Sequence, residues 1–371
     1  MKPKGVPPVA CFLQLMRKVL NTCSQKKAKT GRNCRMSDIL KVRETEASSG
    51  QKKFGWMKIA ESQDSRSAEV PFVLINGKRD GPTVYLQAAV DGDELNPIGV
   101  IRTIVSKIDP ERLSGKIIAV IIANFFGFHS NKSWNPIDKL SMNRVWPGRP
   151  DGSSSERIVH QLWNEMVLQS NYGIDIHQTG ISPSVGSVYV RVGKDEPHHD
   201  TAFEMARVFG SGHILDEKES KIYASDGYNP KAAETKLSWQ ATVRGIPTIT
   251  PELSGSFGWV QDSITKGVRG VENVLKYLKL LQGEPEFPKK QYVVKHLKNA
   301  LANRGGFLEF KHTLGEIIQR DDTIVEITDP FGKMLDNIVA NERCLLWRIS
   351  EYPMVSTGQY TMTLATDIEE I

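Results

Sequence analysis

The chain has 371 residues, of which 39% are hydrophobic and 25% charged, which is ordinary for a globular protein large enough for two domains. No apolar run approaches the roughly 18 residues of a membrane span, which argues against a membrane protein. The net charge is +5, but residues 1–35 carry nine Lys and Arg and no acid, so the remainder has a net charge of −4. An acidic body argues against nucleic-acid binding.

Residues 1–35 form a basic N-terminal extension that has three interpretations: a targeting segment, a disordered tail, or translated upstream sequence preceding a true start at Met36. Its apolar part, "VACFLQLM", is short for a secretory signal and no good cleavage site follows. We favour the tail or the upstream sequence and expect the segment to lie outside the fold. Three of the four cysteines lie here and Cys344 stands alone in the body, which predicts a reducing, cytoplasmic location.

Residues 36–285 alternate between strand-like and helical patterns after a polar start with an edge strand near "FGWMKIA". Alternation of this kind predicts an α/β domain with a mostly parallel sheet. The expected strands are 71–77, 83–90, 115–125, 172–179 and 246–253. The expected helices are 96–108, 153–170, 199–210 and 266–283.

The pattern changes after "GEPEFPKKQ", a Pro- and charge-rich stretch that predicts a linker. Short strands then follow at close spacing: "GGFLEFK", "TIVEITD", "CLLWRIS" and "QYTMTLA". Gly, Asp, Asn and Pro separate them, as in small all-β folds. We therefore expect a catalytic domain over 36–285 and a β domain over 295–371.

Polar side chains gather at the ends of the expected strands, where open α/β sheets bind ligands. Asp91 and Glu94 are three residues apart where a strand bends into a helix, and His177 ends a neighbouring strand. Two carboxylates and an imidazole, with one open position, are a plausible catalytic zinc site. Such an ion would lower the pKa of a bound water towards about 7.

Three further residues could complete a catalytic site. Glu252 follows another strand and could take a proton from water and pass it to a leaving nitrogen. Arg144 offers a planar fork for a substrate carboxylate, with Asn143 beside it. Each residue alone has a structural explanation: Asp91 could cap a helix, and His177 could be a hydrogen-bonded core residue. Their joint position at strand ends and loops favours the functional interpretation.

Four segments in this order, "DGDELNP", "MNRVWPG", "DIHQTG" and "PTITPELSG", resemble the succinylglutamate desuccinylase/aspartoacylase family of zinc hydrolases. The similarity covers roughly residues 70–280, and the C-terminal segments resemble the β domain of larger members. The resemblance implies a zinc-carboxypeptidase-like mixed sheet flanked by helices and a small all-β C-terminal domain. It also implies one zinc ion and hydrolysis of an N-acyl amino acid or related amide.

Residue by residue, the resemblance makes Glu94 and His177 metal ligands, Glu252 the general acid/base, and Asn143 and Arg144 contacts of a substrate carboxylate. Asp91 departs from the family, whose motif is His-Gly-x-Glu. Aspartate is a legitimate zinc ligand, but its charge makes the ion a weaker Lewis acid and suits Mn²⁺ or another oxygen-preferring ion. We favour retained activity over lost catalysis, because residues suited to all the other catalytic and binding roles are present.

Two alternatives remain open. A carboxypeptidase-like peptidase would use the same Arg144 but would need a wider cleft, whereas a C-terminal domain that caps the site admits only small substrates. A non-catalytic small-molecule binding protein would bind no metal. The sequence specifies a small substrate bearing a carboxylate, but neither its acyl group nor its amine, and it leaves a homo-oligomer open.

Overall fold

The structure is a computed structural model that describes residues 39–180, 182–216, 230–254 and 258–371, with the backbone alone at 230–232. The predicted N-terminal extension therefore lies outside the described residues.

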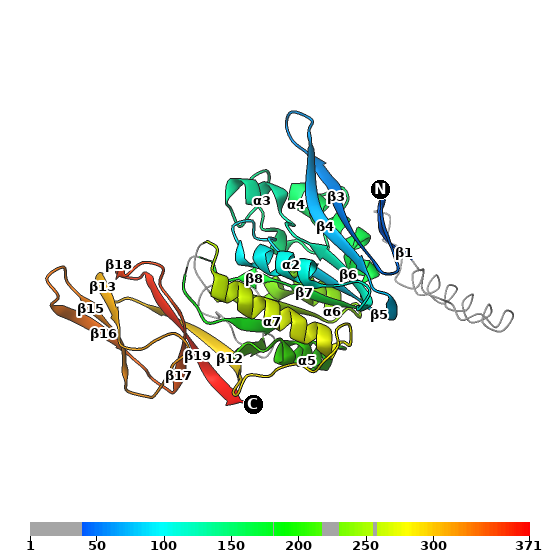
Figure 1. Cartoon of the computed structure of the whole chain (residues 1–371). Helices are drawn as coiled ribbons and strands as arrows, with labels where there is room; N and C mark the ends of the chain where they lie inside the picture. Colours follow the sequence, from blue (N-terminus) through cyan, green and yellow to red (C-terminus); the bar gives the residue numbers. More distant parts are fainter. Residues whose placement is uncertain (1–38, 181, 217–229, 255–257) are drawn as a thin grey trace, which may run out of the picture.

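One large mixed sheet forms the body of the molecule (Figure 1). From one edge, its strands run in the order β3, β4, β6, β5, β7, β11, β9, β10 and β12, and β8 pairs with β11. The central pairs β6–β5, β5–β7 and β7–β11 are parallel, whereas β3–β4, β4–β6 and β9–β11 are antiparallel. The strands are β3 Gln51–Glu61, β4 Ser67–Asn76, β5 Arg79–Gln87, β6 Ser114–Val120, β7 Tyr172–Asp175, β8 His177–Gln178, β9 Ser187–Val190, β10 His213–Asp216, β11 Thr248–Leu253 and β12 Tyr292–Leu301.

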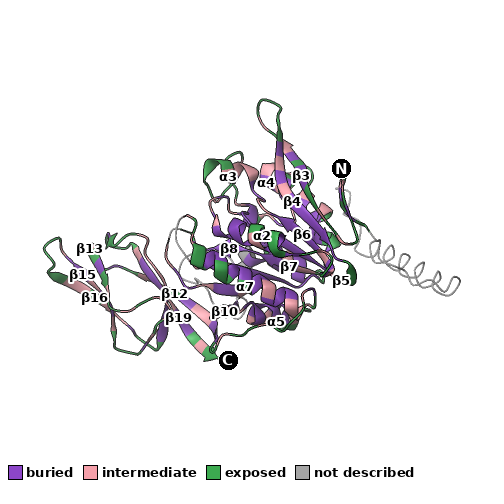
Figure 2. Cartoon of the chain, in the orientation of Figure 1, coloured by how far each residue is buried: buried purple, intermediate pink, exposed green. Residues whose placement is uncertain are grey.

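Helices and a hairpin cover both faces of this sheet and bury its apolar strands (Figure 2). One face packs against α2, α5 and α7, and the other against α4, α6 and the β1–β2 hairpin. The covering elements are β1 Ile39–Val42, β2 Thr45–Ser48, α2 Asn96–Lys107, α4 Ser154–Glu165, α5 His199–Phe209, α6 Leu237–Thr242 and α7 Gln261–Tyr277. The shorter helical elements are α3 Phe125–Ser130, η1 Met142–Arg144, η2 Val167–Gln169 and η3 Pro230–Thr235.

The start of α4 shows how local sequence sets an element. The Ser153 hydroxyl accepts a hydrogen bond from the Glu156 amide at 3.4 Å, and the Glu156 carboxylate accepts one from the Ser153 amide at 2.8 Å. This capping box satisfies two amides that a helix start otherwise leaves unpaired.

The mixed α/β fold is confirmed, but the sheet is larger than the sequence patterns indicate. Strands β9, β10 and β12 were not predicted, and the expected linker leads directly into β12. The C-terminal strands continue the large sheet in the order β12, β19, β17, β14, and a second sheet has the order β16, β15, β13, β18. These strands are β13 Gly306–Phe310, β14 Ile317–Ile318, β15 Thr323–Thr328, β16 Met334–Val339, β17 Cys344–Ile349, β18 Met354–Val355 and β19 Tyr360–Glu370.

An apolar cluster joins the C-terminal strands to the body. Leu215 of β10 and Leu297 of β12 pack with Leu345 and Trp347 of β17. Residues 295–371 thus share both hydrogen bonds and core with the preceding sheet, while the domain limits at 285 and 295 stay a prediction. In the described part of the chain, no helix is long and apolar enough to cross a membrane.

Candidate active site

The loop after β5 carries two of the predicted ligands in a tightly held turn. Its backbone turns at Ala89, which has a φ of +52°. A Cβ at Gly92 would lie only 2.2 Å from the amide nitrogen of Phe128, so this close approach to α3 requires glycine. The side-chain amide of Asn124 donates to the Val90 carbonyl at 3.0 Å and anchors the loop.

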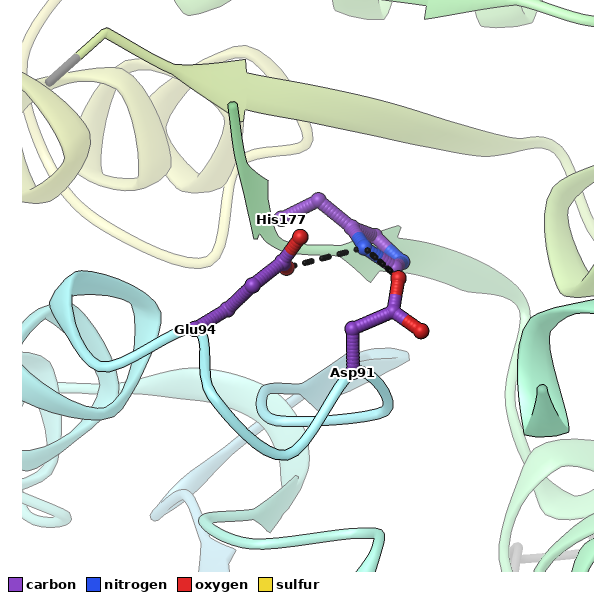
Figure 3. A group of neighbouring side chains, drawn as sticks. All are labelled: Asp91, Glu94 and His177. Carbon is purple, nitrogen blue, oxygen red and sulfur yellow. Dashed lines mark ion pairs between the residues drawn. The ribbon is translucent and has the colours of Figure 1, made fainter. Parts of the chain in front are cut away.

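Asp91, Glu94 and His177 converge at the end of this loop (Figure 3). Nδ1 of His177 lies 3.0 Å from Oε2 of Glu94 and 3.4 Å from Oδ2 of Asp91. The three candidate ligand atoms all lie within 4.8 Å of one another. Glu94 and His177 are buried, and Asp91 is partly exposed. Two carboxylates and an imidazole that face one partly exposed point fit a divalent metal ion.

Neighbouring groups hold these side chains in place. The backbone amide of Gln178 donates to Oε2 of Glu94 at 3.1 Å, and the Gln178 side chain accepts from the Asn96 amide at 2.8 Å. The Ser141 hydroxyl donates to Oδ1 of Asp91 at 3.4 Å. Asp91 does not cap the following helix, because the N-cap position of α2 is Leu95.

A chain of buried polar groups lies behind His177. Oδ2 of Asp175 is 3.4 Å from Nε2 of His177. Oδ1 of Asp175 accepts from the Gln87 amide at 2.7 Å, and Oε1 of Gln87 accepts from the Tyr85 hydroxyl at 2.8 Å. All four side chains are almost completely buried. A carboxylate hydrogen-bonded behind a ligating imidazole is a common outer-shell partner in metal sites.

Burial and crowding of charge shift the pKa values at the centre. Burial raises the pKa of Glu94 well above its usual range, and the nearby Asp91 and Glu252 carboxylates add to this rise against the opposing effect of His177. Burial alone would lower the pKa of His177, but Asp175 and Glu94 raise it well above its usual value. Several negative charges therefore compete for one positive partner, as expected where a cation binds.

The metal-ligand group opens into a cavity of about 460 Å³. Of the six residues predicted from the sequence, Asp91, Glu94, Asn143, Arg144 and Glu252 line it. His177 contacts two of these and is paired in register with Glu252 on the adjacent strand. Asn143 is buried and Arg144 exposed, and both belong to the short η1 helix. The structure thus brings all six together.

The cavity has further walls that the sequence did not indicate. Tyr189 and Arg191 come from β9 and the loop after it, and Leu297 and Arg348 come from the C-terminal strands. Lys236 also lines the cavity, whereas Tyr223 and Tyr228, which precede it in the same stretch of sequence, lie outside the described residues. Asp175 could have been found as the acid two residues before His177, but no local signal marks Arg348.

Comparison with known proteins identifies the family. A profile of the succinylglutamate desuccinylase/aspartoacylase catalytic domain matches residues 80–278, more than half of the chain. The chain belongs to this family. The family resemblance predicted from the sequence is therefore confirmed.

Individual relatives within the family are distant. A curated relative, the N-alpha-acetyl-L-2,4-diaminobutyric acid deacetylase of Halomonas elongata, is 25% identical over 286 residues, which span 74% of this chain and 79% of the relative. The crystal structure of a succinylglutamate desuccinylase/aspartoacylase from Rhodobacter sphaeroides matches with a TM-score of 0.71 and 21% identity, over 89% of this chain and 99% of that chain. A succinylglutamate desuccinylase from Silicibacter sp. TM1040 matches with a TM-score of 0.73 and 20% identity, over 90% and 99%. These structures share the fold, including its C-terminal strands.

Proposed function

We propose that this protein is a metal-dependent amide hydrolase that deacylates a small N-acyl amino acid or a related amide. The observation that carries the proposal is the convergence of Asp91, Glu94 and His177 beside Glu252 in one cavity. The family and the name of the Halomonas relative, a deacetylase of an acetylated amino acid, support the same reaction class.

In this proposal, Asp91, Glu94 and His177 hold one divalent ion, and Nδ1 is the imidazole ligand because it faces both carboxylates. Such an ion supplies Lewis-acid activation of water and of the substrate carbonyl. Zinc fits three ligands of this kind, and the two carboxylates also suit manganese. The ring's other nitrogen lies 3.4 Å from Oδ2 of Asp175, a contact that orients the ligand.

The proton transfers fall to Glu252. Its side chain is partly exposed in the cavity, and its backbone is paired with that of His177, so the carboxylate is next to the metal ligands. It accepts a proton from the attacking water and delivers it to the amide nitrogen as the C–N bond breaks. General acid/base catalysis of this kind typically contributes about 10²–10⁴-fold to the rate.

Asn143 and Arg144 bind the substrate carboxylate. Arg144 is held by a hydrogen bond from Nη1 to the Asn143 carbonyl at 2.9 Å, which leaves other guanidinium donors for a bidentate contact. The cavity of about 460 Å³ is the size of a small-molecule site, and Leu297 and Arg348 close one of its sides. A cavity of this size that is walled on one side by the C-terminal strands favours a deacylase over a carboxypeptidase-like peptidase. The lone body cysteine, Cys344, supports a reducing, cytoplasmic location.

Metal content is the deciding experiment. Protein purified without chelator or metal-affinity resin should contain close to one equivalent of zinc or manganese by inductively coupled plasma mass spectrometry. Asp91→Ala, Glu94→Ala and His177→Ala should each lose it. Asp93→Asn is the matched control, because this acid lies in the same loop but outside the ligand group.

Loaded protein should then release free amine from a panel of N-acetyl and N-succinyl amino acids, and chelator should abolish the release. A wild-type protein that stays metal-free after incubation with zinc or manganese would contradict the proposal. That result would favour the non-catalytic binding protein instead.

A further inference from the structure

We propose that the outer face of the second C-terminal sheet is a homodimer interface, where a second copy of this chain packs about a two-fold axis. This sheet, formed by β16, β15, β13 and β18, projects to one side of the body of the molecule (Figure 1). None of the residues used below lines the metal-ligand cavity. The proposal therefore holds whether or not the protein is a hydrolase.

An apolar row crosses the four strands of this sheet. Phe307 of β13 pairs directly with Met354 of β18 and with Thr328 of β15, and Thr328 pairs with Met334 of β16. Directly paired residues of antiparallel strands have their side chains on the same face, so these four lie side by side. Met334 is 56% exposed, Met354 47% and Phe307 40%. The row is thus an apolar strip that is open to solvent.

The row lies outside the core of the C-terminal strands. Leu308, Ile327 and Val355 each adjoin a row residue in the sequence and point to the opposite face, where they are buried in one cluster. An antiparallel sheet with one buried face is normally polar on the other. The far end of the outer face follows this rule, because Lys311 forms an ion pair with Glu326 there at 2.7 Å. The apolar character is confined to the end that carries the row.

A tight turn holds one further aromatic side chain beside the row. Phe331 lies in the turn between β15 and β16 and is 94% exposed. Oδ1 of Asp329 accepts hydrogen bonds from the Phe331 and Lys333 amides, both at 2.9 Å, and the Gly332 amide donates to the Asp329 carbonyl at 3.0 Å. These bonds fix the backbone that carries the ring. Little conformational entropy is therefore lost when a partner covers it.

Phe307, Phe331, Met334 and Met354 form what we call the apolar patch. With about 150–250 Å² for each aromatic side chain, the exposed fractions correspond to roughly 400–500 Å² of apolar surface. The largest patch on a typical monomer has roughly 300–600 Å² and is often functional. Two copies would bury about 800–1,000 Å² from these side chains alone, close to the roughly 1,000 Å² expected of a biological interface. The surrounding residues would add to this area.

The apolar patch carries no charged side chain, which favours a second copy as its partner. A two-fold contact of the patch with itself brings no like charges together and closes after two copies. The exposed Phe54 and Trp56 on the edge strand β3 differ, because Lys53 and Lys58 of the same strand would face their own copies. A contact between these two different surfaces would be head-to-tail and would extend without closing.

The test measures the particle mass of the full chain by sedimentation velocity and light scattering, from low to high micromolar concentration. Wild type should have the mass of two chains. Phe331→Ser should raise the dissociation constant of the dimer by about 10–100-fold, as loss of a central interface aromatic does. Phe331→Ser combined with Met354→Ser should give monomer throughout. Circular dichroism and a cooperative urea transition verify that both variants fold, as expected for side chains that are exposed in the single chain.

Phe54→Ser is the matched control, because it removes an aromatic ring that is 71% exposed on β3 and lies outside the apolar patch. It should leave the dissociation constant unchanged. A wild type that is monomeric over the whole concentration range overturns the inference, as does an assembly whose mass both patch variants leave unchanged. Dissociation by Phe54→Ser alone would move the interface to β3 and refute the role of the apolar patch.

Discussion

The Asp175 carboxylate lies 3.4 Å from Nε2 of His177, on the opposite side of the ring from Asp91 and Glu94. This relationship favours the tautomer with its proton on Nε2, which leaves the Nδ1 lone pair for a cation. Asp175 is in turn held by Gln87 and, through it, by Tyr85.

Gln87→Leu should therefore weaken both folding and metal binding. It leaves an oxygen of the buried Asp175 without its donor, which costs about 1–3 kcal/mol of unfolding free energy. Loss of an outer-shell partner should also lower metal affinity by about 10–100-fold. Urea denaturation and metal titration measure the two effects. Tyr85→Phe removes only the hydrogen bond from the Tyr85 hydroxyl to Gln87, so it should have a smaller effect on unfolding free energy and on metal affinity. Unchanged metal affinity in Gln87→Leu would contradict the role given to this hydrogen-bond network.

Glu252→Gln should separate catalysis from metal binding. The amide keeps the shape of the side chain but cannot accept a proton, so kcat should fall by about 10²–10⁴-fold. Metal content should stay at the wild-type level, because Glu252 lies outside the ligand group. A variant that lost its metal would show Glu252 to be a ligand, and one with normal kcat would exclude it as the general base.

Asp91→His should change metal preference. The substitution replaces an anionic oxygen ligand with a neutral imidazole, which zinc accepts more readily than manganese does. We expect the ratio of zinc to manganese affinity to rise. We also expect the rate to reach its half-maximal value at a lower pH than in wild type, because the ion becomes a stronger Lewis acid. Competition titrations with both metals and a pH–rate profile check this. A ratio that does not move would mean that Asp91 is not a ligand.

Glu156 should contribute a pH-dependent part of stability at the start of α4. The Arg149 guanidinium and the Ser153 amide hold the pKa of Glu156 down at about 2, below its ordinary value of 4.5. Its contribution is therefore complete above about pH 4.5 and lost as the pH falls towards 2. Glu156→Gln keeps the capping geometry without the charge, so the difference in urea midpoint between wild type and variant should shrink between pH 6 and pH 3. A difference that is constant over this range would contradict the assignment.

More of the metal-ligand group than of the surrounding fold could be predicted from the sequence. Glu94 and His177 could be predicted because each follows an apolar strand, and strands of a parallel sheet end at a common edge. The apolar run over β6 likewise predicts a buried strand. Strands β9, β10 and β12 are short or polar, and tertiary pairing rather than local pattern makes them strands. Arg348 was not foreseeable, because its position depends on a register shift in β17 and on the pairing of this residue with Ser184, which lies soon after His177 in the chain.

Strand β12 has ladder partners on both sides, β10 in the catalytic body and β19 among the C-terminal strands. The hydrogen-bonded sheet therefore continues without a break from the body of the molecule into the C-terminal strands. We expect a single cooperative unfolding transition rather than two. A chain ending near residue 291 would leave β10 as an unprotected edge beside the exposed apolar surface of Leu215 and should aggregate. In this prediction the C-terminal strands protect the edge of the large sheet in addition to forming a wall of its cavity.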